Sequence, residues 1–86
     1  MKTHAIILES QGGPEVMQLK TIDIAEPSDG EILIEQTAIG LNYMDVYQRS
    51  GYYKMQTPMH LGLEAAGTVI KLGSGVTHLN VGDRVC

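Results

Sequence analysis

The sequence predicts a mainly β fold, a small and partly open β-barrel with one short helix. Several short runs of β-branched and other apolar residues follow one another at fairly even spacing, separated by glycine-rich turns. Only one segment, between residues 42 and 51, carries the signals of a helix. At 86 residues, the chain is long enough for one small domain at most.

Two strands are predicted at the N-terminal end of the chain. Thr3–Leu8 is a β-branched and apolar run, and it stops at the turn-forming residues Gly12–Pro14. Val16–Ile24 then alternates, with Ile22 and Ile24 on the same face as the first residue of the run. Such alternation is typical of a strand that is buried on one side.

A third strand is predicted after the strong turn signal of Asp29 and Gly30. Glu31–Ala38 has a period of two, which places Ile32 and Ile34 on the inner face and the glutamates on the outer face. Because the three predicted strands follow one another along the chain, we expect an antiparallel β meander in the front half.

The helix is predicted from its two ends. Asn42 and Asp45 suit a helix start, Arg49 suits the last turn, and Gly51 follows just beyond. There is room for two turns at most. Residues 52–62 contain a proline and no clear periodicity, so we expect an irregular loop, a kind of segment that often carries function.

The C-terminal part is predicted to hold two more strands. Glu64–Leu72 is apolar and β-branched, and Gly67 within it indicates a kink, a bulge or the close approach of another backbone. Gly73–Gly75 turns the chain, and residues 82–86 begin another strand. Since domains seldom end inside a strand, we expect residues 1–86 to be a domain truncated at its C-terminal end.

Composition excludes several classes of function. The formal net charge is -4 and the six basic residues are scattered, which argues against a nucleic-acid partner. No apolar run approaches the roughly 18 to 20 residues that cross a bilayer, and Glu9 interrupts the run that a signal peptide would need. We therefore expect a cytoplasmic protein without a membrane partner. Cys86 is the only cysteine, so no internal disulfide or multi-cysteine zinc site can form.

Motifs for phosphate binding, metal binding and hydrolysis are weak. Gly73 and Gly75 begin a pattern like the dinucleotide fingerprint, but its last position is His78 and a polar turn follows in place of a helix. His4, His60 and His78 show no ligand spacing and are expected to be surface or loop histidines. No serine occupies a nucleophile motif, so hydrolase chemistry is not supported.

The densest set of hydrogen-bonding side chains lies on the predicted helix and the loop after it: Asn42, Asp45, Tyr47, Arg49 and Tyr53. A structural interpretation is that these residues cap the helix, favour its ends and fill core volume. The residues alone favour this interpretation over a functional one.

Longer motifs carry a family resemblance. The segment from Pro58 to Val69, PMHLGLEAAGTV, is followed by GSGV at residues 73–76 and VGDRV at residues 81–85. In this order and spacing, the motifs resemble the N-terminal GroES-like domain of medium-chain dehydrogenases and reductases. GGPEVMQL near the start and AIGLNYMDVYQRSGYY around the helix look like the quinone oxidoreductase, or zeta-crystallin-like, branch. The resemblance covers essentially the whole chain and implies a two-domain α/β reductase whose Rossmann domain is absent from this chain.

The resemblance also implies a chemistry. Zinc alcohol dehydrogenases of the same superfamily have a cysteine where this chain has Asn42 and a histidine where it has Leu63, so we expect no catalytic zinc. The implied activity is NADPH-dependent reduction of quinones, with other α,β-unsaturated carbonyls as the alternative acceptors. By the family match, Asn42 and Asp45 are cofactor-binding residues, whereas Tyr47 and Tyr53 are catalytic residues that line the acceptor pocket and hydrogen-bond its oxygen.

Three charged family positions are assigned to structure. Glu64 is expected to anchor a strand start, Arg84 to pair with a carboxylate, and Arg49 to stabilise the fold. The resemblance further implies a homodimer formed through the cofactor domain. The present residues alone are expected to be inactive and to associate through exposed apolar surface. The alternative outside enzymology is a GroES-like binding module of the co-chaperonin kind, against which the GLEAAG and GDRV motifs count.

Overall fold

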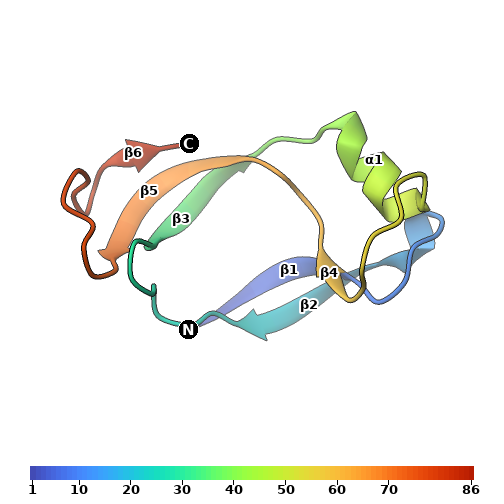
Figure 1. Ribbon diagram of the computed structural model, residues 1–86, viewed down its shortest axis with the longest axis horizontal. Helices are drawn as coiled ribbons and strands as arrows, with labels where there is room; N and C mark the ends of the chain where they lie inside the picture. The colour runs from blue at the N-terminus through green and yellow to red at the C-terminus, as the bar shows by residue number, and fades with distance from the viewer. The chain divides into compact units, whose positions relative to one another are not determined.

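The computed structural model describes all 86 residues, which form two compact units. Unit 1 comprises Met1–Ile24 and Leu41–Leu63, and unit 2 comprises Ala25–Gly40 and Glu64–Cys86. Each unit contains its own three-stranded antiparallel sheet, and the chain has a single α-helix (Figure 1). The mainly β class with open sheets and one short helix agrees with the sequence prediction.

The sheet of unit 1 is built around β1, Lys2–Leu8. Along one edge β1 pairs with β2, Met17–Asp23, in a register that runs from Lys2 opposite Asp23 to Leu8 opposite Met17. Along the other edge it pairs with β4, Met59–His60, a two-residue strand inside the segment that was expected to be irregular throughout. Ile7 and Leu8 are buried, so the C-terminal end of β1 forms the aliphatic core of this unit.

The alternation predicted for the second strand is confirmed. Ile22 and Ile24 are half-buried together with Val16, whereas Leu19 has the opposite parity and is 70% exposed. A one-turn 3₁₀-helix, η1 (Pro14–Val16), connects β1 to β2, and its proline stands in the first turn, where a missing N–H costs no hydrogen bond.

The helix α1, Tyr43–Ser50, begins and ends where the sequence predicts. At its start, the backbone N–H of Asn42 donates to Asp45 Oδ2 at 3.0 Å, and the side chain of Asn42 accepts from the backbone N–H of Asp45 in return. This reciprocal capping box satisfies donors that have no partner within the helix. At its end, Gly51 adopts φ 94°, a left-handed conformation that favours glycine. No helix of the chain has the length and apolarity that crossing a membrane requires.

The sheet of unit 2 has β5, Ala65–Leu72, at its centre. It pairs with β3, Ile32–Ile39, on one side and with β6, Arg84–Val85, on the other. Val69 on β5 is fully buried. Ile32 and Ile34 are half-buried and the glutamates beside them are exposed, as predicted.

Gly67 lies where the backbones of β3 and β5 approach each other closely. A Cβ at this position would meet the carbonyl oxygen of Glu35 and would lie 2.9 Å from the carbonyl carbon of Glu35 and 3.0 Å from Gln36 Cα. The register between the two strands shifts nearby, between Gln36 and Ala38. Of the alternatives predicted for Gly67, a kink, a bulge or the close approach of another backbone, the structure shows the close approach.

The predicted antiparallel meander of the front half is wrong. β3 pairs with β5 and not with β2, although β3 follows β2 along the chain. The connection from β2 to β3 contains Pro27 and is too long for a tight hairpin. Its turn is bonded instead to the turn after β5, because Gly30 N donates to Ser74 O at 2.9 Å and Gly73 N donates to Glu31 O at 2.7 Å.

Candidate functional site

All four tyrosines of the chain meet at α1 and the loop that follows it. Tyr47 is the centre of this tyrosine cluster, with ring centroids 5.2 Å from Tyr43, 4.7 Å from Tyr52 and 5.5 Å from Tyr53. Tyr52 and Tyr53 also contact each other, with centroids 5.2 Å apart. Most of these contacts are edge-on, the geometry that the quadrupoles of aromatic rings favour. The chain has no Phe or Trp, so every large aromatic ring belongs to this cluster.

The tyrosine cluster is open to solvent on its outer side. Tyr47 is half-buried, Tyr53 is 45% exposed, and Tyr43 and Tyr52 are 71% and 73% exposed. None of the four hydroxyls makes a hydrogen bond within the chain. The arrangement can therefore offer flat apolar surface and free hydroxyl donors to a planar polar molecule.

The structure brings the predicted pair Tyr47 and Tyr53 together and adds Tyr43 and Tyr52, which the sequence analysis missed. The four-residue spacing of Tyr43 and Tyr47 was an available signal, since such residues are neighbours on one helix face. The position of Tyr53 is fixed through its backbone, because Tyr53 N donates to the carbonyl oxygen of Tyr47 at 3.3 Å.

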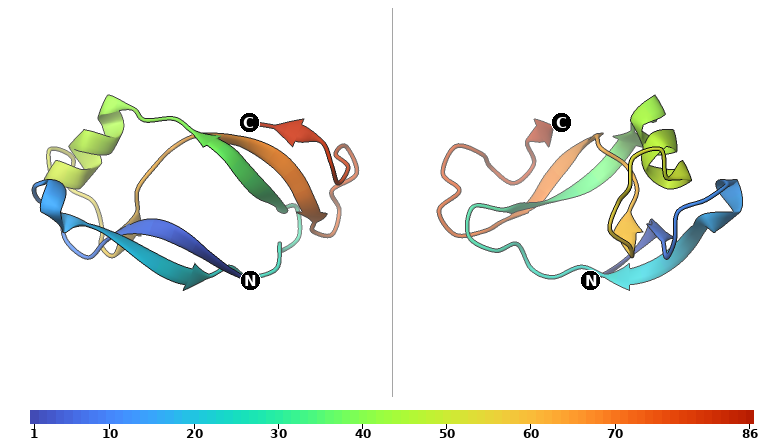
Figure 2. Two further views of the ribbon diagram at one scale, coloured as in Figure 1. Left: turned by 180° about the vertical axis from the view of Figure 1, so that it is seen from behind. Right: turned by 45° about the vertical axis from the view of Figure 1, so that its right-hand side comes forward.

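Gln11 is a second residue that sequence reasoning missed. Its side-chain amide donates from Nε2 to the carbonyl oxygens of Gln48 and Tyr53, both at 2.7 Å, and its Oε1 accepts from Met55 N at 3.3 Å. A glutamine in a polar loop carries no local signal for such contacts. In both views of Figure 2, η1 and the chain before it lie beside the end of α1, which brings Gln11 within reach.

Asn42 and Asp45 stand at the other end of α1. Asp45 is only 3% exposed, and while Oδ2 accepts from Asn42 N, Oδ1 is buried without a hydrogen-bond partner. The structural interpretation of both residues as helix caps is confirmed by these contacts. A direct contact between Asp45 and a cofactor stays a prediction, and the burial of its carboxylate shows that Asn42 is the more accessible of the two.

Arg49 has the structural role that was expected. Its Nη1 donates to the carbonyl oxygen of Gly12 at 2.6 Å, and Gly12 N donates to the carbonyl oxygen of Arg49 at 2.8 Å. These two bonds tie the loop after β1 to the last turn of α1, and one of them is strengthened by the charge of the guanidinium.

Glu64 and Arg84 differ in outcome. The carbonyl oxygen of Glu64 accepts from Gly40 N at 3.3 Å, next to the start of β5, in line with the expected anchoring role. The expected ion pair of Arg84 is wrong, because the salt bridges of the chain are formed by Lys2, Lys20 and Lys71. Arg84 is exposed on the two-residue edge strand β6, where pairing with a carboxylate would gain little.

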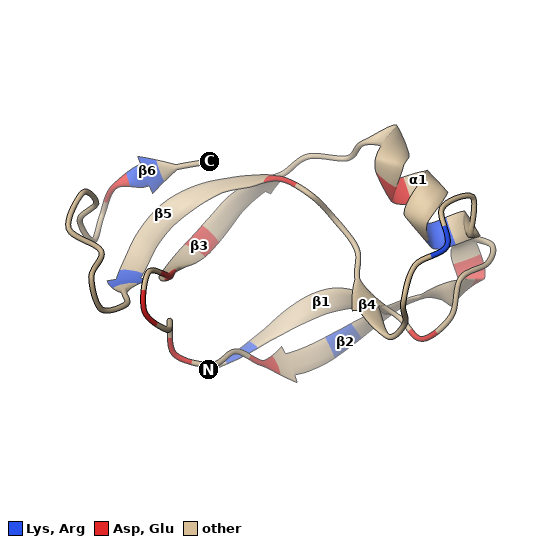
Figure 3. Ribbon diagram, in the orientation of Figure 1, with Lys and Arg blue, Asp and Glu red and all other residues tan.

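The charged residues form no basic surface. The six Lys and Arg residues are distributed singly over β1, β2, β5, β6, α1 and the loop after α1 (Figure 3). Among the acidic residues, Glu26 has a pKa below the ordinary 4.5, because the Lys71 ammonium donates a hydrogen bond to its carboxylate and attracts its negative charge. This pair is exposed and distant in sequence from the tyrosine cluster.

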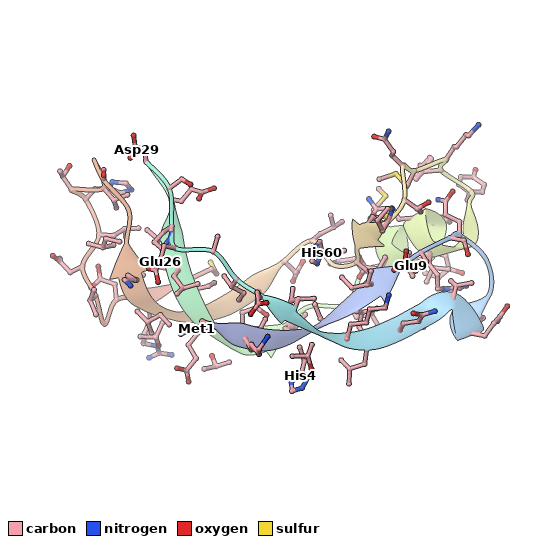
Figure 4. The ribbon with its side chains drawn as sticks, turned by 90° about the horizontal axis from the view of Figure 1, so that it is seen from below. Met1, His4, Glu9, Glu26, Asp29 and His60 are labelled. Carbon is pink, nitrogen blue, oxygen red and sulfur yellow. The ribbon has the colours of Figure 1, made fainter.

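The histidines and glycines assigned to structure behave as expected. His4, His60 and His78 are exposed, and Figure 4 shows His4 on β1 and His60 on β4 with side chains that do not point toward each other. No three residues of the types His, Cys, Asp and Glu are grouped as metal ligands would be. Residues 73–75 form a turn, with Gly75 at φ 80°, and no helix follows them.

Comparison with known proteins shows the family to which this fold belongs. The family model of the alcohol dehydrogenase GroES-like domain matches residues 28–86, and the chain belongs to this family. The chain is 51% identical over 81 residues to a quinone oxidoreductase of Salmonella typhimurium and 49% identical over 81 residues to quinone oxidoreductase 1 of Escherichia coli. Both alignments cover 93% of this chain and 25% of the relative.

Solved structures give the same result. The crystal structure of Escherichia coli quinone oxidoreductase complexed with NADPH matches with a TM-score of 0.91 and 47% identity, covering 95% of this chain and 26% of that one. The predicted place in the quinone oxidoreductase branch of the medium-chain dehydrogenases and reductases is thereby confirmed. The chain spans about a quarter of the length of these relatives.

Proposed function

We propose that this protein is a zinc-independent reductase that uses NADPH to reduce quinones. The observation that carries the proposal is the tyrosine cluster, an exposed aromatic surface with unpaired hydroxyls, in a chain of the quinone oxidoreductase branch. When bound, NADPH supplies a hydride to an acceptor that is already electron-poor. The protein must then bind the acceptor, orient it and stabilise charge on its oxygen.

In this proposal Tyr47 and Tyr53 are the catalytic residues. Their hydroxyls donate hydrogen bonds to the acceptor oxygen on which negative charge develops, and their rings hold its planar body. Asn42 contacts the nicotinamide end of the cofactor. Asp45 serves the cofactor through Asn42, since its Oδ2 fixes the backbone of that residue and its carboxylate is buried.

The donor set of this chain fits one end of the cofactor and not the other. Amide, hydroxyl and aromatic groups suit a nicotinamide and a planar acceptor. The phosphates need backbone N–H groups at a helix start or clustered cations, and neither the turn at residues 73–75 nor the six scattered basic residues provides them. We therefore propose that residues 1–86 act as the substrate-facing domain and that phosphate binding lies outside them.

Zinc independence follows in this proposal from the residues at two positions. Leu63 has no donor atom, and the amide of Asn42 is a poor ligand beside a thiolate. A cytoplasmic location belongs to the same proposal and agrees with the single cysteine, which is exposed and forms no disulfide. A homodimer of the full-length protein also belongs to the proposal, as what the family resemblance implies.

Other α,β-unsaturated carbonyls are the second candidate acceptors. A specific relative favours them, because the chain is 35% identical over 86 residues to a 2-haloacrylate reductase of a Burkholderia species. Quinones and acrylates both carry an electron-poor double bond conjugated to a carbonyl. A planar quinone ring can make more contact with the exposed aromatic surface than a short acrylate can, and for this reason quinones are placed first.

The test compares two hydroxyl deletions in the full-length gene product. Tyr53→Phe keeps the ring contacts but removes a hydroxyl that has no partner in the chain, so stability should be unchanged while kcat/KM for a quinone falls about 10- to 100-fold. Thr21→Val, which removes a hydroxyl from exposed β2, is the control and should leave both unchanged. Equal kinetics of Tyr53→Phe and the parent protein would refute the role of this hydroxyl.

A further inference from the structure

Gln11 joins three segments of unit 1 through one side chain. It stands in the loop after β1, and its amide reaches the last turn of α1 at Gln48, then Tyr53 and Met55 in the loop beyond the helix. Both N–H bonds of Nε2 have acceptors at 2.7 Å, and Oε1 has a donor. The amide thus uses each of its donors and one acceptor site.

The bonds of Gln11 satisfy groups that would otherwise lack partners. Gln48 lies in the last turn of α1, where the carbonyl oxygens find no N–H donor within the helix. Met55 N and the carbonyl oxygen of Tyr53 belong to an irregular loop without a sheet partner. The Gln11 side chain therefore supplies the hydrogen-bond partners that these backbone groups lack within their own segments.

Tyr53 is held at both of its backbone groups. Its N–H donates to the carbonyl oxygen of Tyr47 at 3.3 Å, and its carbonyl oxygen accepts from Gln11 at 2.7 Å. With both peptide groups fixed, the direction of the Cα–Cβ bond is fixed as well, and from this position the ring stands 5.5 Å from that of Tyr47 at an interplanar angle of 78°. Without Gln11, only the weaker of the two bonds would remain.

Residues next to Gln11 hold its side-chain amide against the end of α1. Gly12 exchanges two hydrogen bonds with Arg49, which fixes the loop against the end of α1. Gly51, at φ 94°, has no side chain, and a Cβ there would stand 3.8 Å from Gln11 Cβ and from Gln11 Oε1. The Gln11 side chain thus lies in van der Waals reach of the position of Gly51, at the end of α1.

We propose that Gln11 is the positioning residue of the tyrosine cluster: it fixes the backbone of Tyr53 and so sets where the Tyr53 ring and hydroxyl stand against Tyr47. This inference rests on the proposed function for its catalytic consequence. Gln11 acts through Tyr53 and does not itself touch the acceptor.

Two variants separate the donor and acceptor roles of Gln11. Gln11→Glu keeps an acceptor for Met55 N but replaces two donors with an oxygen that repels the carbonyl oxygens of Gln48 and Tyr53. Gln11→Ala removes all three bonds. Gln18→Ala, which changes an exposed residue of β2, is the matched control.

The first readout needs no activity. Amide hydrogen exchange and ring chemical shifts of the tyrosines are measured by NMR in the full-length protein. Gln11→Ala should speed exchange at Met55 N about fivefold or more and shift the Tyr53 ring signals, whereas Gln11→Glu should shift Tyr53 with a smaller change at Met55. Gln18→Ala should change neither. Unmoved Tyr53 ring signals in both Gln11 variants would overturn the inference.

The second readout is kinetic and distinguishes the two proposals. Both Gln11 variants should raise KM for a quinone about tenfold and leave KM for NADPH unchanged, because only the acceptor side of the site is displaced. Unchanged quinone KM beside a shifted Tyr53 ring would overturn the positioning role in catalysis. If the parent protein lacks quinone reduction, the proposed function fails while the NMR result still decides what Gln11 positions.

Discussion

The Gly67→Ala substitution tests the fold at a point where two backbones lie close together. The added Cβ would fall on the carbonyl oxygen of Glu35 and stand 2.9 Å and 3.0 Å from two further backbone atoms, well inside the 3.4 Å at which ordinary contact begins. These atoms belong to β3 and cannot rotate away as a side chain would. Since β6 pairs along the other edge of β5, relief requires β3 itself to shift.

The cost of this shift can be set from overpacking in well-packed interiors, about 1–3 kcal/mol. The lower flexibility of alanine in the unfolded chain returns about 0.4–1 kcal/mol. We therefore expect a loss of about 1–2 kcal/mol in the free energy of unfolding, measured by urea denaturation followed by far-UV circular dichroism. Gln36→Ala changes an exposed residue directly opposite Gly67 and should stay within about 0.5 kcal/mol of the parent. A Gly67→Ala protein as stable as the parent would refute the close approach.

Three further predictions concern stability. Leu8→Ala empties a fully buried position of β1 and should cost about 2–5 kcal/mol in urea denaturation; a cost below 1 kcal/mol would contradict the assigned core. Gly51→Ala forces alanine into φ 94° and should cost about 1–2 kcal/mol, and an unchanged midpoint would show that α1 ends differently. Glu26→Gln should lower stability at pH 7, and this difference should disappear as the pH falls through the folded pKa of Glu26. The pKa is lowered by Lys71, so the unfolded state binds more protons and the stabilisation is lost at low pH; equal pH profiles of the two proteins would contradict the ion pair.

Local signals predicted the elements of this fold well. The helix was found from its cap residues and its terminal glycine, and the long strands either from alternation or from runs of β-branched and apolar residues, because these signals act within a few residues of the chain. The alternatives predicted for Gly67 included the correct one, because a glycine inside a strand commonly marks a bulge, a bend or the close approach of another backbone. The family motifs then identified the fold as a GroES-like domain, which the periodicity of apolar residues alone could not do.

Pairing partners could not be predicted from the same signals. β3 pairs with β5, although more than twenty residues separate the two strands in the sequence. β2, which precedes β3 directly along the chain, pairs only with β1. Which strands meet depends on loop length and on burial throughout the chain, so a local pattern that defines a strand does not define its partner. The error over Arg84 has the same origin, since ion pairing at an exposed edge is weakly determined.

The candidate site was predicted in part. The structure brings Tyr47 and Tyr53 together, and their catalytic role stays a prediction; Tyr43 and Tyr52 were not recognised as members of the same cluster. Gln11 was invisible to sequence reasoning, because its role arises only when the loop after β1 folds against the end of α1.

The most direct test of the proposed function is NADPH oxidation by the full-length gene product with 1,4-quinones and short enones, before and after exhaustive chelation of metals. The account predicts turnover that survives the chelator, is faster with quinones, and falls about 10- to 100-fold in Tyr53→Phe. Oxidation of simple alcohols that the chelator abolishes, or the absence of any nicotinamide-dependent turnover, would contradict it.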